Sequence, residues 1–398
     1  MTKARTALAL ILLLLAACSS PSGVPVESAP RIHNDLTGMA CASPSLCFAV
    51  GSTFMNGKDG YSDYRTLIER WNGSSWSIVD SPNSASGESH LSKVSCTSLS
   101  LCFAVGYDGP YVPRGRPLIV KWNGFSWSEV PTPNVSGLLR DLQCPSSSLC
   151  FAVGQYAPSE GNGNGLIERW DGTSWTVMPD LHEGLLFAVG CATPSFCFAT
   201  GIDYTFQGGH TVALHLTELW DGSSWRVVPS GTQQGEYEVD SISCSSRTQC
   251  AGSGSYNNHF PSLSMMEAWD GTSWRAVETP HPAVQANEAN VFDSLVSVSC
   301  VDASFCMAAG RHFSQIPHSQ RSETLVERWG GSTWTIVRSP NGSPSPGFND
   351  ALQAVACVSE SRCLAIGVFD ALDGYLQVLA ELWNGTSWSV VPSSNRTG

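Results

Sequence analysis

The sequence predicts an all-β fold, a seven-bladed β-propeller in which each blade is a four-stranded antiparallel meander. A unit of about fifty residues recurs seven times, and each copy carries two cysteines and two tryptophans. Each copy contains short apolar or alternating runs between Gly, Pro, Asn and Ser turns, and charged residues are only 14% of the chain. This pattern is typical of short strands and not of long charged helices. A lone meander cannot bury both of its faces, whereas seven packed around an axis can.

The N-terminus predicts export. Lys3 and Arg5 form a positive segment before an apolar run over 7–17, which is too short to span a bilayer and is typical of a signal peptide. The segment Leu15-Ala16-Ala17-Cys18 resembles the lipobox of bacterial lipoproteins, in which cleavage precedes a cysteine that carries a diacylglyceryl group. We therefore expect residues 1–17 to be removed and Cys18 to anchor the protein on the extracytoplasmic side of the cell membrane. The Ser/Pro-rich residues 18–32 would form a tether. The alternative is an ordinary secretory signal in which Cys18 is incidental.

The other cysteines predict disulfides. Of 15 cysteines, Cys18 is the odd one, and the rest form pairs with five residues between the members. In an exported chain such pairs indicate disulfides, whereas zinc-binding pairs usually have roughly two to four residues between them. The expected bridges are Cys41–Cys47, Cys96–Cys102, Cys144–Cys150, Cys191–Cys197, Cys244–Cys250, Cys300–Cys306 and Cys357–Cys363.

Each copy divides into two hairpins. In the second copy, Leu91–Cys96 and Cys102–Gly106 are expected to be strands that the cysteine pair closes. In the first copy, Leu67–Trp71 and Trp76–Val79 flank Asn72-Gly73, a pair that accepts the positive φ of a tight turn.

The propeller is expected over residues 33–398. Its repeats start near residues 36, 91, 138, 185, 239, 295 and 352. Each blade comes from consecutive sequence, so ring closure is expected to depend on packing between the first and last blades.

The repeat also resembles a known family. An apolar strand with a terminal glycine, Cys102–Gly106, is followed by a variable loop, a strand ending in Trp122, a turn and a strand led by Trp127. This order is similar to the kelch repeat of galactose oxidase-like propellers and covers nearly all of the chain after residue 33. The sequence departs from kelch in having one glycine where kelch usually has two, a tryptophan where tyrosine is common, and the cysteine pair.

Composition and cysteine usage exclude several functions. The formal net charge is -13, which disfavours binding to nucleic acid. Copper chemistry like that of galactose oxidase needs a cysteine linked to a tyrosine, and every cysteine here already has another assignment. We expect no cofactor and no metal site, and we expect a monomer.

The two ends of the blades should differ. The loops between the second and third strands and the links between blades share one end, here called the variable face. The cysteine-hairpin turns and the Asn-Gly turns share the other end, here called the short-turn face. The loops expected on the variable face are long and unlike one another, and a rigid frame with variable loops is a common arrangement for binding. They are Ser52–Thr66, Tyr107–Arg116, Gln155–Gly165, Ile202–Leu214, Ser255–Ser264 and Arg311–Glu323.

The candidate ligand-binding residues are the histidines and tyrosines of the variable face. All nine His and all nine Tyr fall in its segments or at adjoining strand ends, either because they bind a ligand or because the repeated core excludes them. Tyr107, Tyr156, Tyr204 and Tyr256 follow the second strands, so they could ring the channel mouth and stack on a sugar or grip a peptide, or they could simply pack. His210, His259, His312 and His318 come from the loops of three adjacent blades and could converge as a metal site, although we do not favour one.

A glutamate two residues before the first tryptophan of a copy recurs in every copy except the second. Its recurrence around the ring favours a structural role over a catalytic one, since a catalytic acid would be needed only once. These glutamates are Glu69, Glu168, Glu218, Glu267, Glu327 and Glu381.

The sequence favours a non-catalytic surface module that binds or scaffolds a protein, peptide or glycan through its variable face. One alternative is a carbohydrate-active hydrolase or lyase with its site at the channel mouth. Another is a purely structural envelope protein. An enzyme should show carboxylates or His converging in one pocket, whereas a binding module should show a shallow surface lined by aromatic rings.

Overall fold

The described part of the chain is all-β, and no helix occurs in it. The computed structural model describes residues 32–56, 62–84, 87–109, 115–156, 163–179, 184–207, 210–230, 237–256, 263–283, 289–316, 319–343, 349–372 and 374–396. The predicted leader and Cys18 lie outside these residues. No helix in the described ranges is long and apolar enough to cross a membrane.

Seven sheets each contain four consecutive antiparallel strands, as the repeats predicted. The strands are β1 (Ile32–Ser43), β2 (Leu46–Asn56), β3 (Ser62–Trp71) and β4 (Trp76–Val79) in blade 1; β5 (Ser89–Ser98), β6 (Leu101–Asp108), β7 (Arg116–Trp122) and β8 (Trp127–Glu129) in blade 2; β9 (Gly137–Ser146), β10 (Leu149–Tyr156), β11 (Asn164–Trp170) and β12 (Trp175–Val177) in blade 3; β13 (Gly184–Thr193), β14 (Phe196–Gln207), β15 (His210–Trp220) and β16 (Trp225–Val227) in blade 4; β17 (Tyr237–Ser246), β18 (Gln249–Tyr256), β19 (Ser264–Trp269) and β20 (Trp274–Val277) in blade 5; β21 (Ala289–Cys300), β22 (Cys306–Ile316), β23 (Ser319–Trp329) and β24 (Trp334–Ile336) in blade 6; and β25 (Ala351–Ser359), β26 (Arg362–Asp370), β27 (Leu376–Trp383) and β28 (Trp388–Val390) in blade 7.

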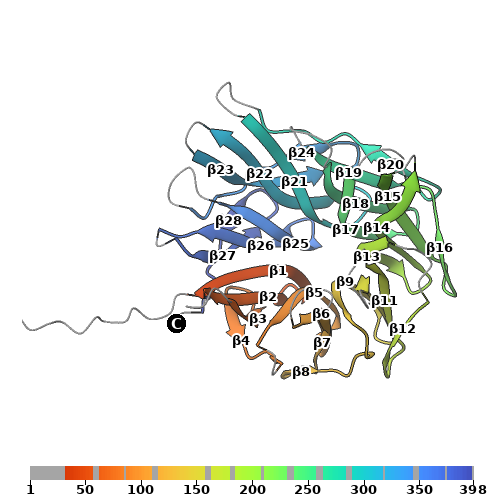
Figure 1. The fold of residues 1–398 in the computed structure, drawn as a ribbon. Coiled ribbons are helices and arrows are strands. Elements are labelled where there is room, and N and C mark those ends of the chain that lie inside the picture. Colours follow the sequence, from red (N-terminus) through yellow and green to blue (C-terminus); the bar gives the residue numbers. More distant parts are fainter. Residues whose placement is uncertain are drawn as a thin grey trace, which may run out of the picture.

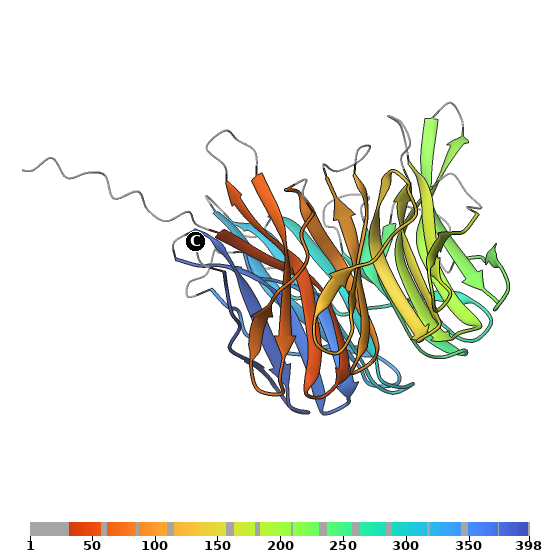
Figure 2. The same cartoon turned by 90° about the horizontal axis from the view of Figure 1, so that it is seen from below.

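The blades are arranged radially around a central axis (Figure 1). The first strand of each blade lies innermost and contacts the first strands of both neighbouring blades, including β1 against β25. The strands of neighbouring blades run side by side between the variable face and the short-turn face (Figure 2). The expected closure between the first and last blades is therefore present.

Phenylalanine side chains of one blade pack against the tryptophan pair of the next blade and hold the two blades together. We call these phenylalanines aromatic wedges. The phenylalanine after the second cysteine of blade 1, Phe48, lies with its ring centroid 5.0 Å from those of both Trp122 and Trp127 in blade 2. Phe103, Phe151 and Phe198 repeat this contact with the tryptophan pair of the following blade at 4.9–5.4 Å. Such tilted and edge-to-face arrangements are the favourable ones for aromatic rings. The repeated Phe and Trp residues thus form the core between blades.

All seven expected disulfides are present. Each joins directly opposed strands of a first hairpin, with Cα–Cα distances of 3.9–4.0 Å. This many disulfides indicates an extracellular or otherwise oxidising environment. The outer turn is also built as expected, because Gly73 has a φ of 102° and Asn72 Oδ1 accepts the backbone N–H of Ser74 at 2.9 Å.

Every innermost strand carries a β-bulge at the same place, four residues before its first cysteine. The strand register shifts there in all seven blades. A bulge leaves one residue unpaired and redirects its side chain. The bulge residues differ in every blade: Thr37, Ser92, Arg140, Phe187, Asp240, Val296 and Gln353.

Side chains on the innermost strands also tie each blade to the next. Ser297 Oγ accepts the backbone N–H of Val355 at 3.1 Å, and Ser95 Oγ accepts that of Cys144 at 3.0 Å. Asp141 Oδ2 does the same for Val189 at 2.9 Å. These groups line a channel cavity of about 230 Å³. Because they satisfy backbone donors of the inner strands, we interpret this cavity as structural.

The recurring glutamates are buried between blades. All six are at most 2% exposed. Burial raises the pKa of Glu69 to about 7 and that of Glu168, Glu327 and Glu381 to about 8. Ser339, in the link that leaves blade 6, donates to Glu381 of blade 7 at 2.7 Å. The burial agrees with the structural role expected for this position.

The C-terminal segment joins blade 7 to blade 1 by the same kind of serine–glutamate hydrogen bond. Ser393 Oγ, beyond β28, donates to Glu69 Oε2 of blade 1 at 2.8 Å, just as Ser339 donates to Glu381. The backbone N–H of Arg396 donates to Asn34 Oδ1 at 2.9 Å. The terminal segment therefore takes the place that a link to a further blade would occupy.

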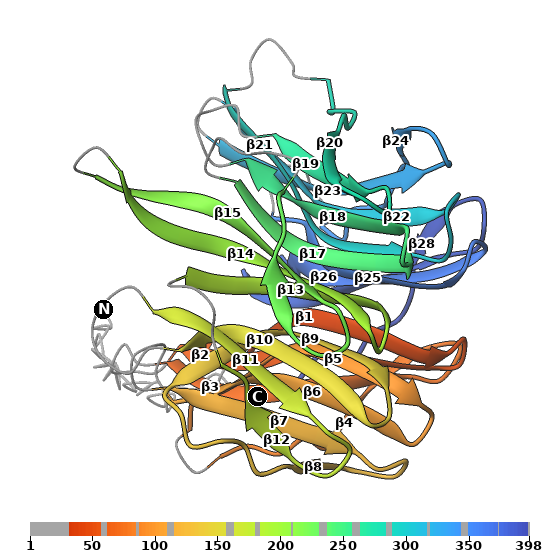
Figure 3. The ribbon, with the colours of Figure 1, turned by 90° about the vertical axis from the view of Figure 1, so that its right-hand side faces the viewer.

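The strands on the variable face run further than the sequence indicated. Ile202–Leu214 was expected to be a loop, but β14 extends to Gln207 and pairs with β15 from His210 onward (Figure 3). The expected loops Ser52–Thr66 and Arg311–Glu323 are likewise shortened by the pairing of β2 with β3 and of β22 with β23. These extensions consist of residues that can pair but that do not repeat from blade to blade, so the repeat pattern gave no sign of them.

Candidate functional site

The predicted ligand-binding residues whose side chains the structure describes do not form one cluster. The ring of Tyr107 stacks on that of His90 in its own blade. Tyr156 packs against the core between blades 2 and 3. Tyr204 lies near Glu238 and Arg140. His312 lies in a separate group in blade 6. His210 and Tyr256 lie in strands, but their side chains are outside the described part, and His259 and His318 lie wholly outside it. The ring of tyrosines and the convergence of histidines therefore remain predictions.

A continuous row of six rings crosses the variable face from blade 7 through blade 1 to blade 2. We call it the aromatic band, and its members are Tyr375, His33, Phe54, Tyr64, His90 and Tyr107. Successive ring centroids are 4.2–5.3 Å apart. All six side chains are half-buried, so each keeps part of its surface in solvent.

Strand register explains how the band is assembled. His33 lies opposite Phe54, Phe54 lies opposite Tyr64, and His90 lies opposite Tyr107 in adjacent antiparallel strands. Directly opposed side chains on one face of a sheet are close enough for aromatic contact. The contacts of Tyr64 with His90 and of His33 with Tyr375 then join three blades.

Both histidines of the band are held as neutral rings. The backbone N–H of Leu376 donates to His33 Nδ1 at 3.2 Å, which fixes that nitrogen as an acceptor. Burial lowers the pKa of His90 to about 4. At neutral pH the band is therefore an uncharged aromatic surface, in which His33 stacks on Phe54 and His90 stacks on Tyr107.

A second group of side chains lies around the channel on blades 3 to 5. The Arg140 guanidinium sits 5.3 Å from the ring centroid of Phe187, and both are bulge residues. Burial, reinforced by the Glu238 carboxylate, raises the pKa of Asp240 to about 7. Outside this group, on the first strand of blade 1, burial also raises the pKa of Asp35 to about 6. These carboxyls could exchange protons near neutral pH.

A third group is a carboxylate held between two imidazoles in blade 6. His312 Nδ1 is 2.5 Å from Asp293 Oδ1, and His281 Nδ1 is 3.3 Å from Asp293 Oδ2. Asp293 and His312 face each other across β21 and β22, whereas His281 comes from the link that enters blade 6. His312 and Glu323 line a hollow of about 720 Å³ between blades 6 and 7.

This arrangement orients the two imidazoles. Because both present Nδ1 to the same carboxylate, they point toward it and not toward a shared point in the hollow. Within the described ranges, no three His, Cys, Asp or Glu side chains are grouped so as to hold a metal.

Sequence reasoning missed two of these features. The band includes Phe54, which lies outside the His and Tyr set, and its contacts join His33 to Tyr375 across the ring seam. The bulge residues could have been found, because the position four residues before the first cysteine varies from Thr to Arg to Asp while its neighbour on one side is always Leu or Val. A variable position inside an otherwise regular strand indicates an exposed or ligand-facing side chain.

No family model and no curated protein matches this chain. Among solved structures, it resembles a PL25 ulvan lyase at 7% identity over 91% of this chain and 96% of the lyase chain, with a TM-score of 0.57. It resembles the GH74 xyloglucanase of Xanthomonas campestris at 12% identity over 90% of this chain and 55% of that one, with a TM-score of 0.55. A chain described as YCF48 bound to D1 peptide shares 11% identity over 89% of this chain and 92% of that chain, with a TM-score of 0.48. These likenesses show a β-propeller fold alone and do not single out kelch propellers.

Proposed function

We propose that this protein is a non-catalytic surface lipoprotein that binds a glycan along the aromatic band. The observation that carries the proposal is the row of six half-buried rings crossing three blades. A surface lined by aromatic rings is part of what a binding module was expected to show. We keep the kelch-like relationship of the repeat as part of the proposal, because each blade retains the strand order that suggested it.

The chemistry of the band favours sugars over the other ligand classes. Its rings form a neutral apolar surface that can pack against the C–H groups of a saccharide, and its tyrosine hydroxyls can bond to sugar hydroxyls. His33 and His90 add ring surface without charge at neutral pH. A row of several contacts suits a chain of sugar units better than a single small molecule.

A glycan array with the chain from Ser19 to Gly398 tests this function. We expect retention of at least one polysaccharide and a loss of about tenfold in affinity for Tyr64→Ala, since one stacking ring contributes about 1–1.5 kcal/mol. Tyr204→Ala is the comparison variant, because Tyr204 is on the variable face but outside the band, and an equal loss there would place the ligand on the predicted ring of tyrosines and not on the band. Retention of peptides or proteins in place of glycans would contradict the glycan assignment, and retention of neither would favour a structural role.

A second function is favoured by a specific observation. Burial raises the pKa of Asp240 to about 7 beside Arg140 at the channel, which would suit a general acid in a hydrolase or lyase. Two of the similar folds belong to polysaccharide-degrading enzymes by their descriptions, but such distant likeness carries no activity across. Release of reducing ends or unsaturated products from a retained glycan, and loss of that release in Asp240→Asn, would establish this alternative.

Lipidation of Cys18 belongs to the same proposal. It rests on the segment Leu15-Ala16-Ala17-Cys18 and on the disulfides, which require export. Mass spectrometry of the membrane-extracted protein should show a diacylglyceryl-modified N-terminal peptide, and Cys18→Ser should abolish it. An unmodified mature N-terminus at another residue would identify an ordinary secretory signal.

A further inference from the structure

One interface between blades lacks a large apolar side chain at the position that follows the second cysteine. In blades 1 to 4 the residue after the second cysteine is phenylalanine and fills the space before the next tryptophan pair, but in blade 5 it is Ala251. The cross-strand neighbour of this position is Arg70, Lys121, Arg169 or Leu219 in blades 1 to 4, and in blade 5 it is Ala268. Two large side chains are therefore missing at the same point.

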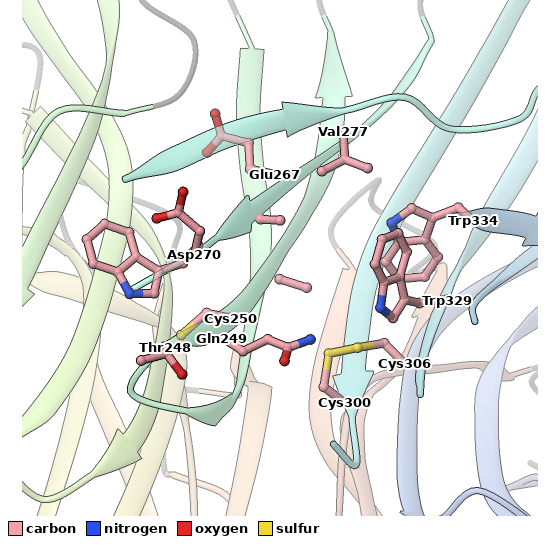
Figure 4. A pocket seen from close by; sticks show the side chains of 13 residues that line it. Thr248, Gln249, Cys250, Glu267, Asp270, Val277, Cys300, Cys306, Trp329 and Trp334 are labelled. Atoms are coloured by element: carbon pink, nitrogen blue, oxygen red, sulfur yellow. A yellow bond between two sulfur atoms is a disulfide. The ribbon is translucent and has the colours of Figure 1, made fainter. Parts of the chain in front are cut away.

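The result is a pocket between blades 5 and 6 (Figure 4). It has a volume of about 240 Å³, and Ala251, Ala268, Trp329 and Trp334 are among the residues that line it. Trp329 is half-buried, whereas the corresponding tryptophans of the other six blades are buried. Its indole N–H donates to Ala303 O at 3.1 Å, so the indole's polar atom is satisfied and its ring surface faces the pocket.

The other interfaces show what shape this pocket accepts. At four of them a benzyl side chain lies with its ring 4.9–5.4 Å from both tryptophan rings. Interfaces 6–7 and 7–1 are filled by Met307 and Leu364. An apolar pocket that is left empty forfeits dispersion contacts and binds small aromatic molecules readily. The missing group has the size of a phenylalanine side chain.

The same chain exposes such a side chain on the same face. Phe125 lies in the outer turn of blade 2 and is 92% exposed. In the other six blades this turn position is Ser or Thr, and in blade 1 the hydroxyl of Ser74 bonds to Asn72 Oδ1 at 2.8 Å. Leu99, in the neighbouring cysteine-hairpin turn of blade 2, is 58% exposed. At this turn position blade 2 thus exposes the apolar side chain of Phe125, here called the knob, whereas the other six blades have a hydroxyl.

We propose that Phe125 of a second copy of this chain inserts into the pocket between blades 5 and 6. Both the knob and the pocket belong to the ring of outer turns on the short-turn face, since Trp329 and Trp334 flank the blade 6 turn that corresponds to the turn carrying Phe125. Two copies packed through this face around a two-fold axis form the contact twice, because a residue that meets its partner in one direction also does so in the other.

The two contacts lie far apart. Figure 1 places β8 of blade 2 on the opposite side of the ring from β20 and β24 of blades 5 and 6. Because the two inserted Phe125 side chains lie on opposite sides of the ring, they fix the rotation of one copy relative to the other. The variable faces then point away from each other, so the dimer is compatible with ligand binding on both. This proposal differs from the monomer that the sequence suggested, and the experiment below decides between them.

Sedimentation velocity of the chain from Ser19 to Gly398 over a concentration series tests the proposal. We expect a monomer–dimer equilibrium that strengthens with added NaCl, because each copy without Lys3 and Arg5 carries a formal charge of -15, against -13 for the full sequence, and salt screens the repulsion. Phe125→Ser, which restores the repeat, and Ala251→Phe, which fills the pocket, should each raise the dissociation constant by about tenfold or more. Leu372→Ser is the matched control, since Leu372 is 79% exposed but lies in the β26–β27 connection on the variable face, and it should leave the equilibrium unchanged.

A mixture of the two variants makes the test specific. Phe125→Ser keeps the pocket and Ala251→Phe keeps the knob, so an equimolar mixture should associate more strongly than either variant alone. Thermal unfolding confirms that both variants fold, and Ala251→Phe should unfold at a higher temperature than the wild type. A wild-type protein that stays monomeric at all concentrations, or a dimer that persists unchanged in both variants, overturns the proposal. Binding of phenol by a monomeric wild type would show that the pocket takes a small aromatic molecule and would equally overturn the second copy as its occupant.

Discussion

The buried glutamates make the stability of the ring depend on pH, and Glu168 gives the clearest prediction. Its side chain is fully buried, and neither carboxyl oxygen has a hydrogen-bond partner among the described residues. Burial raises its pKa from 4.5 to about 8. Between these two values the folded chain holds a proton that the unfolded chain releases, so stability falls as the pH rises through this range. Below about pH 4.5 the penalty disappears.

The change Glu168→Gln removes this dependence. A pKa difference of one unit corresponds to about 1.4 kcal/mol, so the wild type loses about 3 kcal/mol at pH 7 and less than about 1 kcal/mol at pH 5. The variant should recover that loss, which for a chain of this length raises the unfolding temperature by roughly 3–5 °C at pH 7. Scanning calorimetry at pH 5, 7 and 8 on both proteins measures the difference.

Blade 2 supplies the matched control. Val120 occupies the corresponding position and is fully buried, so Val120→Glu should destabilise the protein more at pH 8 than at pH 5. If Glu168→Gln stabilises the protein equally at pH 5 and pH 8, or destabilises it at pH 8, the glutamate is not the neutral buried acid inferred here.

Three further predictions concern the links between and within blades. Ser297→Ala removes the acceptor of the Val355 N–H and should lower the free energy of unfolding by about 1–2 kcal/mol in a urea titration. Replacing both Cys96 and Cys102 by Ala should lower it by about 2 kcal/mol, since the bridge closes a short loop. Ser393→Ala removes the donor to Glu69 at the ring seam and should cost about 1 kcal/mol, with a larger effect at pH 8 than at pH 5 in calorimetry.

Ser389→Ala is the control for these variants. Ser389 is exposed on β28, and a substitution there should change stability by no more than about 0.5 kcal/mol. Equal losses for Ser297→Ala and Ser389→Ala would refute the role of the side-chain links between blades. Equal stability of the protein with and without the Cys96–Cys102 bridge would refute the contribution of that disulfide, and a pH-independent loss for Ser393→Ala would refute the role of Glu69 at the seam.

The propeller framework was predictable because the residues that build it recur from blade to blade. Cysteine spacing predicted all seven disulfides, and the Trp pairs around Asn-Gly or Asp-Gly predicted the outer hairpins. These features need only contacts that are local in sequence. The same repetition also exposes Ala251 as a departure, although the sequence alone could not show that the neighbouring Ala268 lies opposite it.

The site was less predictable because its contacts are not local. His33 and Tyr375 are at opposite ends of the chain and meet only because the ring closes. Tyr64 meets His90 only because blade 2 follows blade 1 at a particular angle. Sequence reasoning placed these residues on the correct face, but strand register and blade packing decide which of them touch.

The aromatic band is tested most directly by proton NMR of the histidine rings during titration with a glycan retained on the array. A saccharide stacked on the band should shift the ring protons of His33 and His90 and leave those of His281 unchanged, because His281 lies in the separate group with Asp293. Shifts at His281 with none at His33 or His90 would place the ligand at blade 6 and contradict the assignment of the band as the binding surface.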